Sequence, residues 1–111
     1  MAHSEQRDFV LRMRRRFPEH FQKCRVLEVG SRNINGSVRE LFAECDFIGI
    51  DAVPGDCVDV VALGHQFDAP RPFDTVISCE AFEHDPHFPE TVANIHRLLR
   101  TGGVFIATCG G

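Results

Sequence analysis

The stretch of residues 24–38, CRVLEVGSRNINGSV, constrains the fold of this chain more than any other part of the sequence. Its first half is an apolar run typical of a short buried strand, and Gly30 and Gly36 bound the loop that follows. The residues after Gly36 favour a helix. α/β proteins build nucleotide pockets from a strand that enters a helix through such a loop, because a glycine backbone can approach the ligand closely.

Glu28 lies at the end of this strand, two residues before Gly30. A phosphate-binding loop avoids an acid there, because the carboxylate would repel the phosphates. The loop also lacks the Gly-Lys-Ser/Thr of a P-loop, and Arg32 stands where the dinucleotide pattern G-x-G-x-x-G has its second glycine. The stretch therefore favours a ligand that carries a positive charge at one end.

The composition is that of a globular domain. With 111 residues, 43% apolar and 25% charged, the chain has room for one domain with a core of its own. The net charge of -4 gives no reason to expect nucleic acid or an anionic membrane as a partner. Five cysteines, an odd number without a C-x-x-C pair, favour reduced thiols in the cytoplasm over disulfides or a zinc site.

Strand and helix patterns alternate along the chain. We expect helices over residues 4–17, 36–44 and 89–100, and strands over residues 25–29, 46–51, 57–61, 73–79 and 104–109. On the segment 36–44, Val38, Leu41 and Phe42 share one face. The arginines of the first helix are expected on a solvated face rather than at a binding site.

Alternation of strands and helices predicts an α/β fold with a doubly wound parallel sheet of strand order 3-2-1-4-5. We expect a single domain, with an N-terminal helix in residues 1–20 and a Rossmann-like core in residues 24–111. Ligands bind such sheets beyond the carboxyl ends of the strands, where the winding reverses. The loops there are residues 30–36 and 80–87, which carry the densest polar chemistry in the sequence.

Asp51 ends the second strand, 21 residues after Gly30. A carboxylate at this place can accept hydrogen bonds from both hydroxyls of a ribose. An acid that only favours the following turn is the alternative, but the spacing from the glycine loop makes the ribose role the better hypothesis.

In order along the chain, these pieces resemble the class I S-adenosylmethionine-dependent methyltransferases, in the small branch that reads LEVGS…NGSVR. The matching pieces are VLEVG (26–30), NGSVR (35–39), FIGID (47–51), VDVV (58–61), FDTVIS (73–78), EAFEH (80–84) and LLRTGG (98–103). The resemblance covers residues from about 24 to 111.

The resemblance implies S-adenosylmethionine as the cofactor and assigns roles by position. The methionine end would be held by Glu28 and the loop residues Gly30, Ser31, Asn35 and Gly36; the ribose by Asp51; the adenine by Ala52, Val53, Gly64 and His65; and the sulfonium side would be closed by Cys79 and Glu80. Two departures stand out. The first loop is two residues longer than the family's E/D-x-G-x-G-x-G and lacks the middle glycine. Leu63 stands near the place where the family often has an acid beside the adenine amino group.

Glu83 and His84 lead a polar cluster at the mouth of the expected pocket, together with Asp85 and His87. One interpretation makes Glu83 or His84 a catalytic general base or a substrate anchor. The other interpretation gives the cluster a structural role in the loop and at the N-cap of the next helix, with Asp85 placed favourably before the helix N-terminus. A metal site is disfavoured, because the spacing fits no standard zinc motif.

Class I methyltransferases usually carry two further strands after strand five, whereas this sequence stops at Gly111. We expect a fragment or a truncated chain, which keeps the cofactor half of such an enzyme; completion of the edge by a partner chain is the alternative. The fifth strand of this sequence would form an uncovered apolar edge, and for a naturally complete chain that edge predicts self-association through the strand.

The sequence therefore predicts an S-adenosylmethionine-dependent methyltransferase acting on an unknown acceptor. The alternatives are a module that binds this cofactor but is catalytically incomplete and, less favoured because of Glu28 and Arg32, a nicotinamide-dinucleotide-binding domain. No apolar run is long enough to span a membrane, and we expect no membrane partner.

Overall fold

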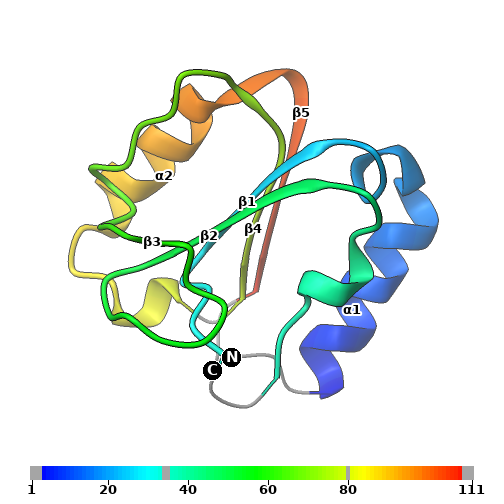
Figure 1. Ribbon diagram of the computed structural model, residues 1–111, viewed down its shortest axis with the longest axis horizontal. Coiled ribbons are helices and arrows are strands. Elements are labelled where there is room, and N and C mark those ends of the chain that lie inside the picture. The colour runs from blue at the N-terminus through cyan, green and yellow to red at the C-terminus, as the bar shows by residue number, and fades with distance from the viewer. Residues whose placement is uncertain (1–3, 34–35, 80, 109–111) are drawn as a thin grey trace.

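A computed structural model describes residues 4–33, 36–79 and 81–108 (Figure 1). Its strands form one parallel sheet in the order β3-β2-β1-β4-β5, as predicted. The strands are β1 (Arg25–Val29), β2 (Asp46–Asp51), β3 (Val60–Val61), β4 (Phe73–Cys79) and β5 (Leu99–Thr108). β1 lies in the centre, where Val26 is in register with Phe47 of β2 and with Thr75 of β4.

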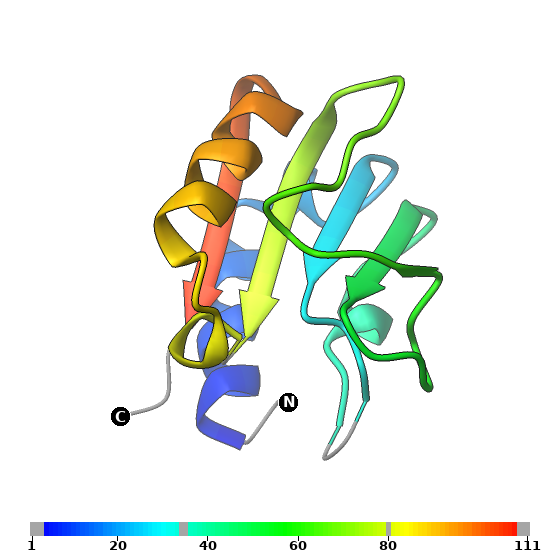
Figure 2. The ribbon, with the colours of Figure 1, turned by 90° about the vertical axis from the view of Figure 1, so that its left-hand side faces the viewer.

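Helices cover both faces of the sheet, which confirms the doubly wound α/β fold (Figures 1 and 2). α1 (Ser4–Arg16) packs on one face, where Val10 joins Val26 and Ile77 in a buried cluster. α2 (Phe88–Leu98) packs on the other, where Ile95 joins Leu27 and Val76. Alternate residues of β1 and β4 therefore serve two separate cores, as the period of two in a strand requires.

The predicted helix over residues 36–44 is wrong in extent. Only the 3₁₀ turn η2 (Arg39–Leu41) forms there, with bonds from the N–H of Leu41 to the Val38 carbonyl (2.9 Å) and from Phe42 to Arg39 (3.1 Å). The hydroxyl of Ser37 accepts the N–H of Arg39 at 3.1 Å, a local bond that competes with helical pairing. Val38, Leu41 and Phe42 are nevertheless all buried in the α1-side core, as the pattern indicated.

The strands and helix near the sheet edges differ in length from the prediction. β3 holds two residues instead of five. Cys57 adopts a left-handed backbone (φ 66°) that an extended strand excludes, and pairing with β2 is limited to Ile50↔Val60 and Asp51↔Val61. α2 ends at Leu98, and β5 begins at once with Leu99 rather than at residue 104. A register shift between the Phe73↔Leu99 and Thr75↔Val104 pairs accommodates the extra residues, with Gly102 at φ 82°.

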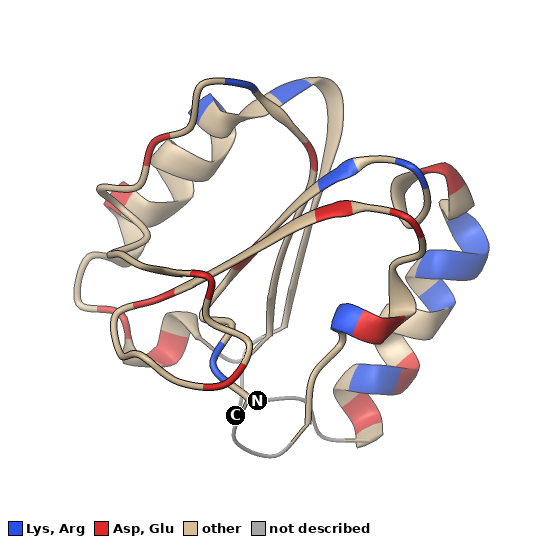
Figure 3. Ribbon diagram, viewed as in Figure 1, with Lys and Arg blue, Asp and Glu red and all other residues tan. Residues whose placement is uncertain are grey.

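The arginines of α1 are distributed along the helix (Figure 3). Arg7 pairs with exposed Glu40 at 2.6 Å, and Arg14 donates to the Leu41 carbonyl at 3.3 Å. These contacts tie α1 to η2 across the surface. Among the described helices, none has the length and apolar character needed to cross a bilayer.

Candidate functional site

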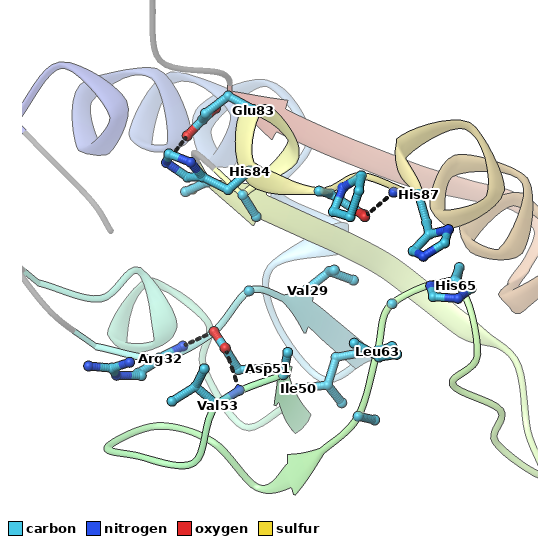
Figure 4. Close-up of a pocket in the computed structure, with 18 residues that line it drawn as sticks. Val29, Arg32, Ile50, Asp51, Val53, Leu63, His65, Glu83, His84 and His87 are labelled. Atoms are coloured by element: carbon cyan, nitrogen blue, oxygen red, sulfur yellow. Dashed lines mark hydrogen bonds and ion pairs between the residues drawn. The ribbon is translucent and has the colours of Figure 1, made fainter.

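A cavity of about 640 Å³ opens at the carboxyl ends of the parallel strands, where the sheet topology places ligand sites (Figure 4). Its size lies within the range of small-molecule sites. It is lined by residues at the ends of β1, β2 and β4 and in the segments that follow β1, β2, β3 and β4: Val29, Gly30, Arg32, Ile50, Asp51, Ala52, Val53, Ala62, Leu63, Gly64, His65, Cys79, Ala81, Glu83, His84, Asp85, Pro86 and His87.

Asp51 is held rigidly at the end of β2. Its Oδ2 accepts the backbone N–H of Arg32 at 3.1 Å, and its Oδ1 accepts the N–H of Val53 at 3.0 Å (Figure 4). The carboxylate therefore joins the loop after β1 to the turn after β2. Each oxygen keeps a second acceptor position for a ligand hydroxyl, because an ionised carboxylate has about four lone-pair sites.

Gly30 lets the loop after β1 turn tightly against its neighbours. Its φ is 78°, and a Cβ built on it would lie 2.6 Å from the Cβ of Ala81 in the loop after β4. The N–H groups of Gly30 and Ser31 both donate to the carbonyl of Ile50, at 2.9 and 3.0 Å. The backbone is thus fixed against β2, and a side chain at position 30 would separate the two loops.

Ser31 serves the same loop from the side away from the cavity. Its hydroxyl donates to the carbonyl of Cys57 at 2.8 Å, and the side chain is buried. Arg39 reaches the same carbonyl at 3.1 Å and also the Oδ2 of Asp59 at 2.6 Å. Gly49 makes this packing possible, since a Cβ there would lie 2.5 Å from the Cys57 carbonyl oxygen.

Asp59 is the acidic partner in this cluster. Partial burial raises its pKa, but the hydrogen bonds from Arg39 and from the N–H of Gly49 (2.7 Å) lower that pKa overall. The Arg39–Asp59 pair therefore stays charged at neutral pH. It connects η2, β2 and the segment before β3 behind the cavity wall.

Gly64 and His65 approach α2 on the opposite side of the cavity. The side-chain amide of Asn94 donates to the carbonyls of Gly64 and Phe67, both at 2.8 Å. The ring of His65 stacks on that of His87 with centroids 4.1 Å apart (Figure 4). These contacts attach the loop after β3 to the start of α2 and form one wall of the cavity.

The segment after β4 supplies the polar mouth. Glu83 and His84 belong to the 3₁₀ turn η3 (Phe82–His84), and the Oε1 of Glu83 lies 3.6 Å from the Nε2 of His84. Asp85 accepts bonds from the N–H of His87 (2.7 Å) and the hydroxyl of Thr91 (2.6 Å). Asp85 is thus occupied at the start of α2, as the N-terminal interpretation expected, whereas Glu83 and His84 face the cavity.

Glu28 does not line this cavity. Its neighbours in β1, Leu27 and Val29, face the core under α2. Because successive side chains of a strand point to opposite faces, the side chain of Glu28 lies on the α1 side of the sheet. It is 5% exposed, and its Oε1 has no hydrogen-bond partner within the described residues. Burial raises the pKa of Glu28 to about 8, although the nearby Arg39 opposes the rise. The group is mostly neutral at pH 7.

Nine of the residues predicted to bind the cofactor or to act in catalysis come together at the cavity: Gly30, Asp51, Ala52, Val53, Gly64, His65, Cys79, Glu83 and His84. Glu28, Ser31 and Gly36 are not part of its lining. Asn35 and Glu80 lie outside the described residues.

The sequence analysis assigned no role to the apolar residues that line the cavity from the ends of the strands. Val29, Ile50 and Ala62 line the cavity from strand ends, and Ala81 closes it beside Gly30. For Val29 and Ile50, the position at the end of an apolar strand was the pattern in the sequence that could have predicted this role. Within the described residues, no group of three or more His, Cys, Asp or Glu side chains is arranged to hold a metal ion.

Comparison with known proteins places this geometry in a family. A family model described as "Methyltransferase domain" matches residues 1–109. Among solved structures, a similar one is the MycE methyltransferase from the mycinamycin biosynthetic pathway, in complex with Mg and SAH, at 25% identity and a TM-score of 0.61. The match covers 97% of this chain and 34% of that chain, so the chain spans about a third of the length of MycE.

A comparison with curated proteins finds no match. The family model spans almost the whole sequence, and the sheet order is the one the resemblance implied. The chain belongs to the methyltransferase-domain family, and its resemblance to class I S-adenosylmethionine-dependent methyltransferases is confirmed.

Proposed function

We propose that this chain binds S-adenosylmethionine in the cavity at the carboxyl ends of the strands and transfers its methyl group to an acceptor still to be identified. The observation that carries the proposal is Asp51, whose two oxygens are each fixed by a backbone N–H while facing the cavity. The family match and the SAH bound by MycE support the choice of cofactor.

The residues around Asp51 suit an adenosine group. Ala52 and Val53 follow it in the turn, and Ile50 and Leu63 add apolar surface to the same cavity. Val53 and Leu63 are largely exposed for apolar side chains, which is the state expected of surface that a flat aromatic ring would cover. Gly64 and His65 would border the ring from the α2 side.

The opposite part of the cavity would hold the methionine end. There the backbone of Gly30 meets Ala81, and Cys79 ends β4 beside them. Ser31 and Gly36 would act indirectly, by fixing the loop, since neither lines the cavity. Glu28 would contribute as a neutral buried group beneath the loop, because its raised pKa removes most of its charge at pH 7.

When bound, the cofactor supplies an electrophilic methyl group on a sulfonium sulfur. The residues of this chain would hold the acceptor in line with it, and such positioning can provide much of the rate. Glu83 and His84 lie at the cavity mouth and could take a proton from an oxygen or nitrogen acceptor.

A second candidate follows from the comparison with MycE. Because the chain spans 34% of that protein, it could bind the cofactor without completing a substrate site. In both cases we propose a cytoplasmic location, which the odd number of cysteines and the absence of a C-x-x-C pair support.

Isothermal calorimetry with S-adenosylmethionine, S-adenosylhomocysteine and NAD tests the shared part of the proposal. We expect heat with both sulfur ligands and none with NAD. Asp51→Ala should weaken binding at least about tenfold, because hydrogen bonds to a charged group are each worth about 1.5–3 kcal/mol. Asp8→Ala is the control, since Asp8 is an exposed acid on α1 and does not line the cavity.

No binding of either sulfur ligand would overturn the proposal. Binding together with methyl transfer from labelled cofactor, in a screen of small-molecule, protein and nucleic-acid acceptors, would identify the enzyme. Binding without transfer to any acceptor would favour the incomplete module.

A further inference from the structure

We propose that Cys24 and Cys45 form an oxidation site, at which a peroxide converts the two thiols into a reversible intramolecular disulfide. The two sulfur atoms lie 3.6 Å apart, and both side chains are partly exposed. This inference is independent of the cofactor site. It depends on how the tertiary structure aligns two cysteines that are 21 positions apart in the sequence.

The pair sits where two parallel strands begin side by side. Cys24 directly precedes β1 and Cys45 directly precedes β2, one position before the Arg25↔Asp46 pair. The N–H of Asp46 donates to the Cys24 carbonyl at 3.0 Å, so the backbone hydrogen bonding between the two strands already extends to Cys24. Adjacent strands are about 4.8 Å apart. That spacing falls inside the range of about 4.4–6.8 Å between the Cα atoms of a disulfide.

The backbone on both sides holds the two cysteines in place. The N–H of Lys23 donates to the Ala43 carbonyl at 3.0 Å, and the N–H of Ala43 donates to the Phe21 carbonyl at 2.9 Å. The sulfurs must move from 3.6 Å to the bonding distance of about 2.05 Å. Because the flanking backbone is already paired, side-chain rotation can supply most of that movement.

The surroundings assign different roles to the two thiols. Burial raises the pKa of Cys24 to about 12, with the neighbouring Cys45 adding to the rise, so Cys24 remains a thiol. The proposal therefore assigns the attack on peroxide to the sulfur of Cys45, which reacts as a thiolate because the thiolate is the nucleophilic form of cysteine. Its sulfur attacks one peroxide oxygen, the O–O bond breaks, and Cys45 sulfenic acid and hydroxide form.

The second step closes the bond. The sulfur of Cys24 attacks the sulfur of the sulfenic acid, the S–O bond breaks, and the departing hydroxide takes the Cys24 proton as water. Overall, two thiols are oxidised to a disulfide, and one peroxide is reduced to water. A thiol reductant reverses the reaction by exchange.

The site lies at the amino ends of the strands, whereas the cavity lies at their carboxyl ends. The new bond would close a loop that contains β1, the glycine loop and η2. It would therefore restrain the segment that shapes the cavity without filling the cavity itself. Restraint of the unfolded chain predicts a higher melting temperature for the oxidised protein.

Peptide mapping after treatment with hydrogen peroxide tests the proposal. The whole chain is oxidised at neutral pH, alkylated to block the remaining thiols, and digested without reductant by trypsin and Asp-N. These proteases place Cys24 in the dipeptide of residues 24–25, Cys45 in residues 40–45 and Cys57 in a separate peptide. We expect a linked 24–25/40–45 species that a phosphine reductant releases.

Two variants complete the experiment. Cys45→Ser should abolish the linked species, and Cys57→Ser should leave it unchanged, since Cys57 is also partly exposed and lies apart from the pair. Oxidised wild-type protein should melt at least about 5 °C higher than its reduced form, and Cys45→Ser should show no such shift. Full alkylation of Cys24 and Cys45 after peroxide, or over-oxidation of Cys45 without a cross-link, would overturn the proposal.

Discussion

Gly30 and Ala81 bring the two loops of the cavity into contact at a spacing that excludes any side chain on Gly30. A Cβ at position 30 would lie 2.6 Å from the Cβ of Ala81, and the φ of 78° is one that L-residues rarely adopt. The contact couples the loop after β1 to the loop after β4, across the point where the winding of the sheet reverses.

Gly30→Ala should therefore weaken the binding of S-adenosylmethionine at least about tenfold, and should lower the free energy of unfolding by about 1–3 kcal/mol. Calorimetry and urea unfolding measure the two effects. Gly102→Ala is the control, because its φ of 82° imposes similar backbone strain, whereas Gly102 does not line the cavity and its added Cβ would meet the end of the Arg100 side chain at 3.1 Å. Equal binding by Gly30→Ala and wild type would show that the contact between the loops does not shape the site.

Glu28 should make the protein less stable as the pH rises. Its pKa is about 8 in the folded state and near 4.5 when unfolded, so the folded state binds the proton more tightly. Stability is therefore lost between about pH 4.5 and pH 8. Glu28→Gln keeps the shape of the neutral acid and removes this dependence. We expect it to match wild type at pH 5 and to exceed it by on the order of 3 kcal/mol at pH 8.5.

Thermal and urea unfolding at the two pH values check this prediction. Glu40→Gln, which changes an exposed acid in a surface pair, should stay within about 0.5 kcal/mol of wild type at both. The same pH dependence in Glu28→Gln and wild type would contradict the assignment of the titration to Glu28.

The Arg39–Asp59 pair should contribute to the stability of the wall behind the cavity. The pKa of Asp59 is lowered overall, so its contribution is present at neutral pH and is lost as the pH falls through the acidic range. Asp59→Asn should lower the free energy of unfolding by about 1 kcal/mol at pH 7, with little effect near pH 3. Asp8→Asn, at an exposed acid of α1, is the control, and equal losses of stability in the two variants would argue against the pair.

Glu83 and His84 should affect the rate of methyl transfer more than cofactor binding. With an acceptor in hand, Glu83→Gln and His84→Ala should each reduce kcat by about 10²–10⁴-fold if the group acts as general base, because proton transfer contributes about that much. Calorimetry should show that the variant that removes the general base binds the cofactor with an affinity within about threefold of that of the wild type. An unchanged kcat in both variants would exclude a general-base role for Glu83 and His84 and would favour a role in the structure of the loop.

β5 is the outer strand of the sheet in the order β3-β2-β1-β4-β5. Within the described residues, only β4 pairs with it, so we predict self-association through its other edge. Multi-angle light scattering should show a mass that rises with protein concentration. Thr101→Lys, which adds a charge at an exposed β5 position, should reduce that rise. A strictly monomeric mass over the whole range would disprove the prediction.

The local sequence pattern was sufficient to predict the helix and strands whose residues pack on a continuous core. The apolar runs of β1, β2 and β4 and the periodicity of α1 predicted these elements within a few residues. The segment after Gly36 departed from its pattern, because Ser37 bonds the backbone locally and Arg39 pairs with Asp59 on another strand. The start of β5 depended on a register shift against β4, which no periodicity in the sequence encodes.

The candidate site divides in the same way. Asp51 and the Glu83–His84 pair could be predicted because they end or follow strands whose carboxyl ends must meet at one edge of a parallel sheet, whereas Gly64 and His65 were predicted from the family resemblance. The direction in which Glu28 points could not be deduced from the glycine motif. It follows from the alternation of β1 between two cores, which the packing of α1 and α2 makes distinct.

By itself the sequence determined the α/β class and the strand order, because strand-and-helix alternation and handed crossovers leave few topologies. Its ordered motifs carried the resemblance to the methyltransferase family, which the family model confirms. The tertiary structure alone decided which side chains reach the cavity, that Glu28 is buried and largely neutral, and that Cys24 and Cys45 lie 3.6 Å apart. The physical reason is that burial, side-chain direction and contact between distant segments are set by packing across the sheet, which a one-dimensional pattern does not contain.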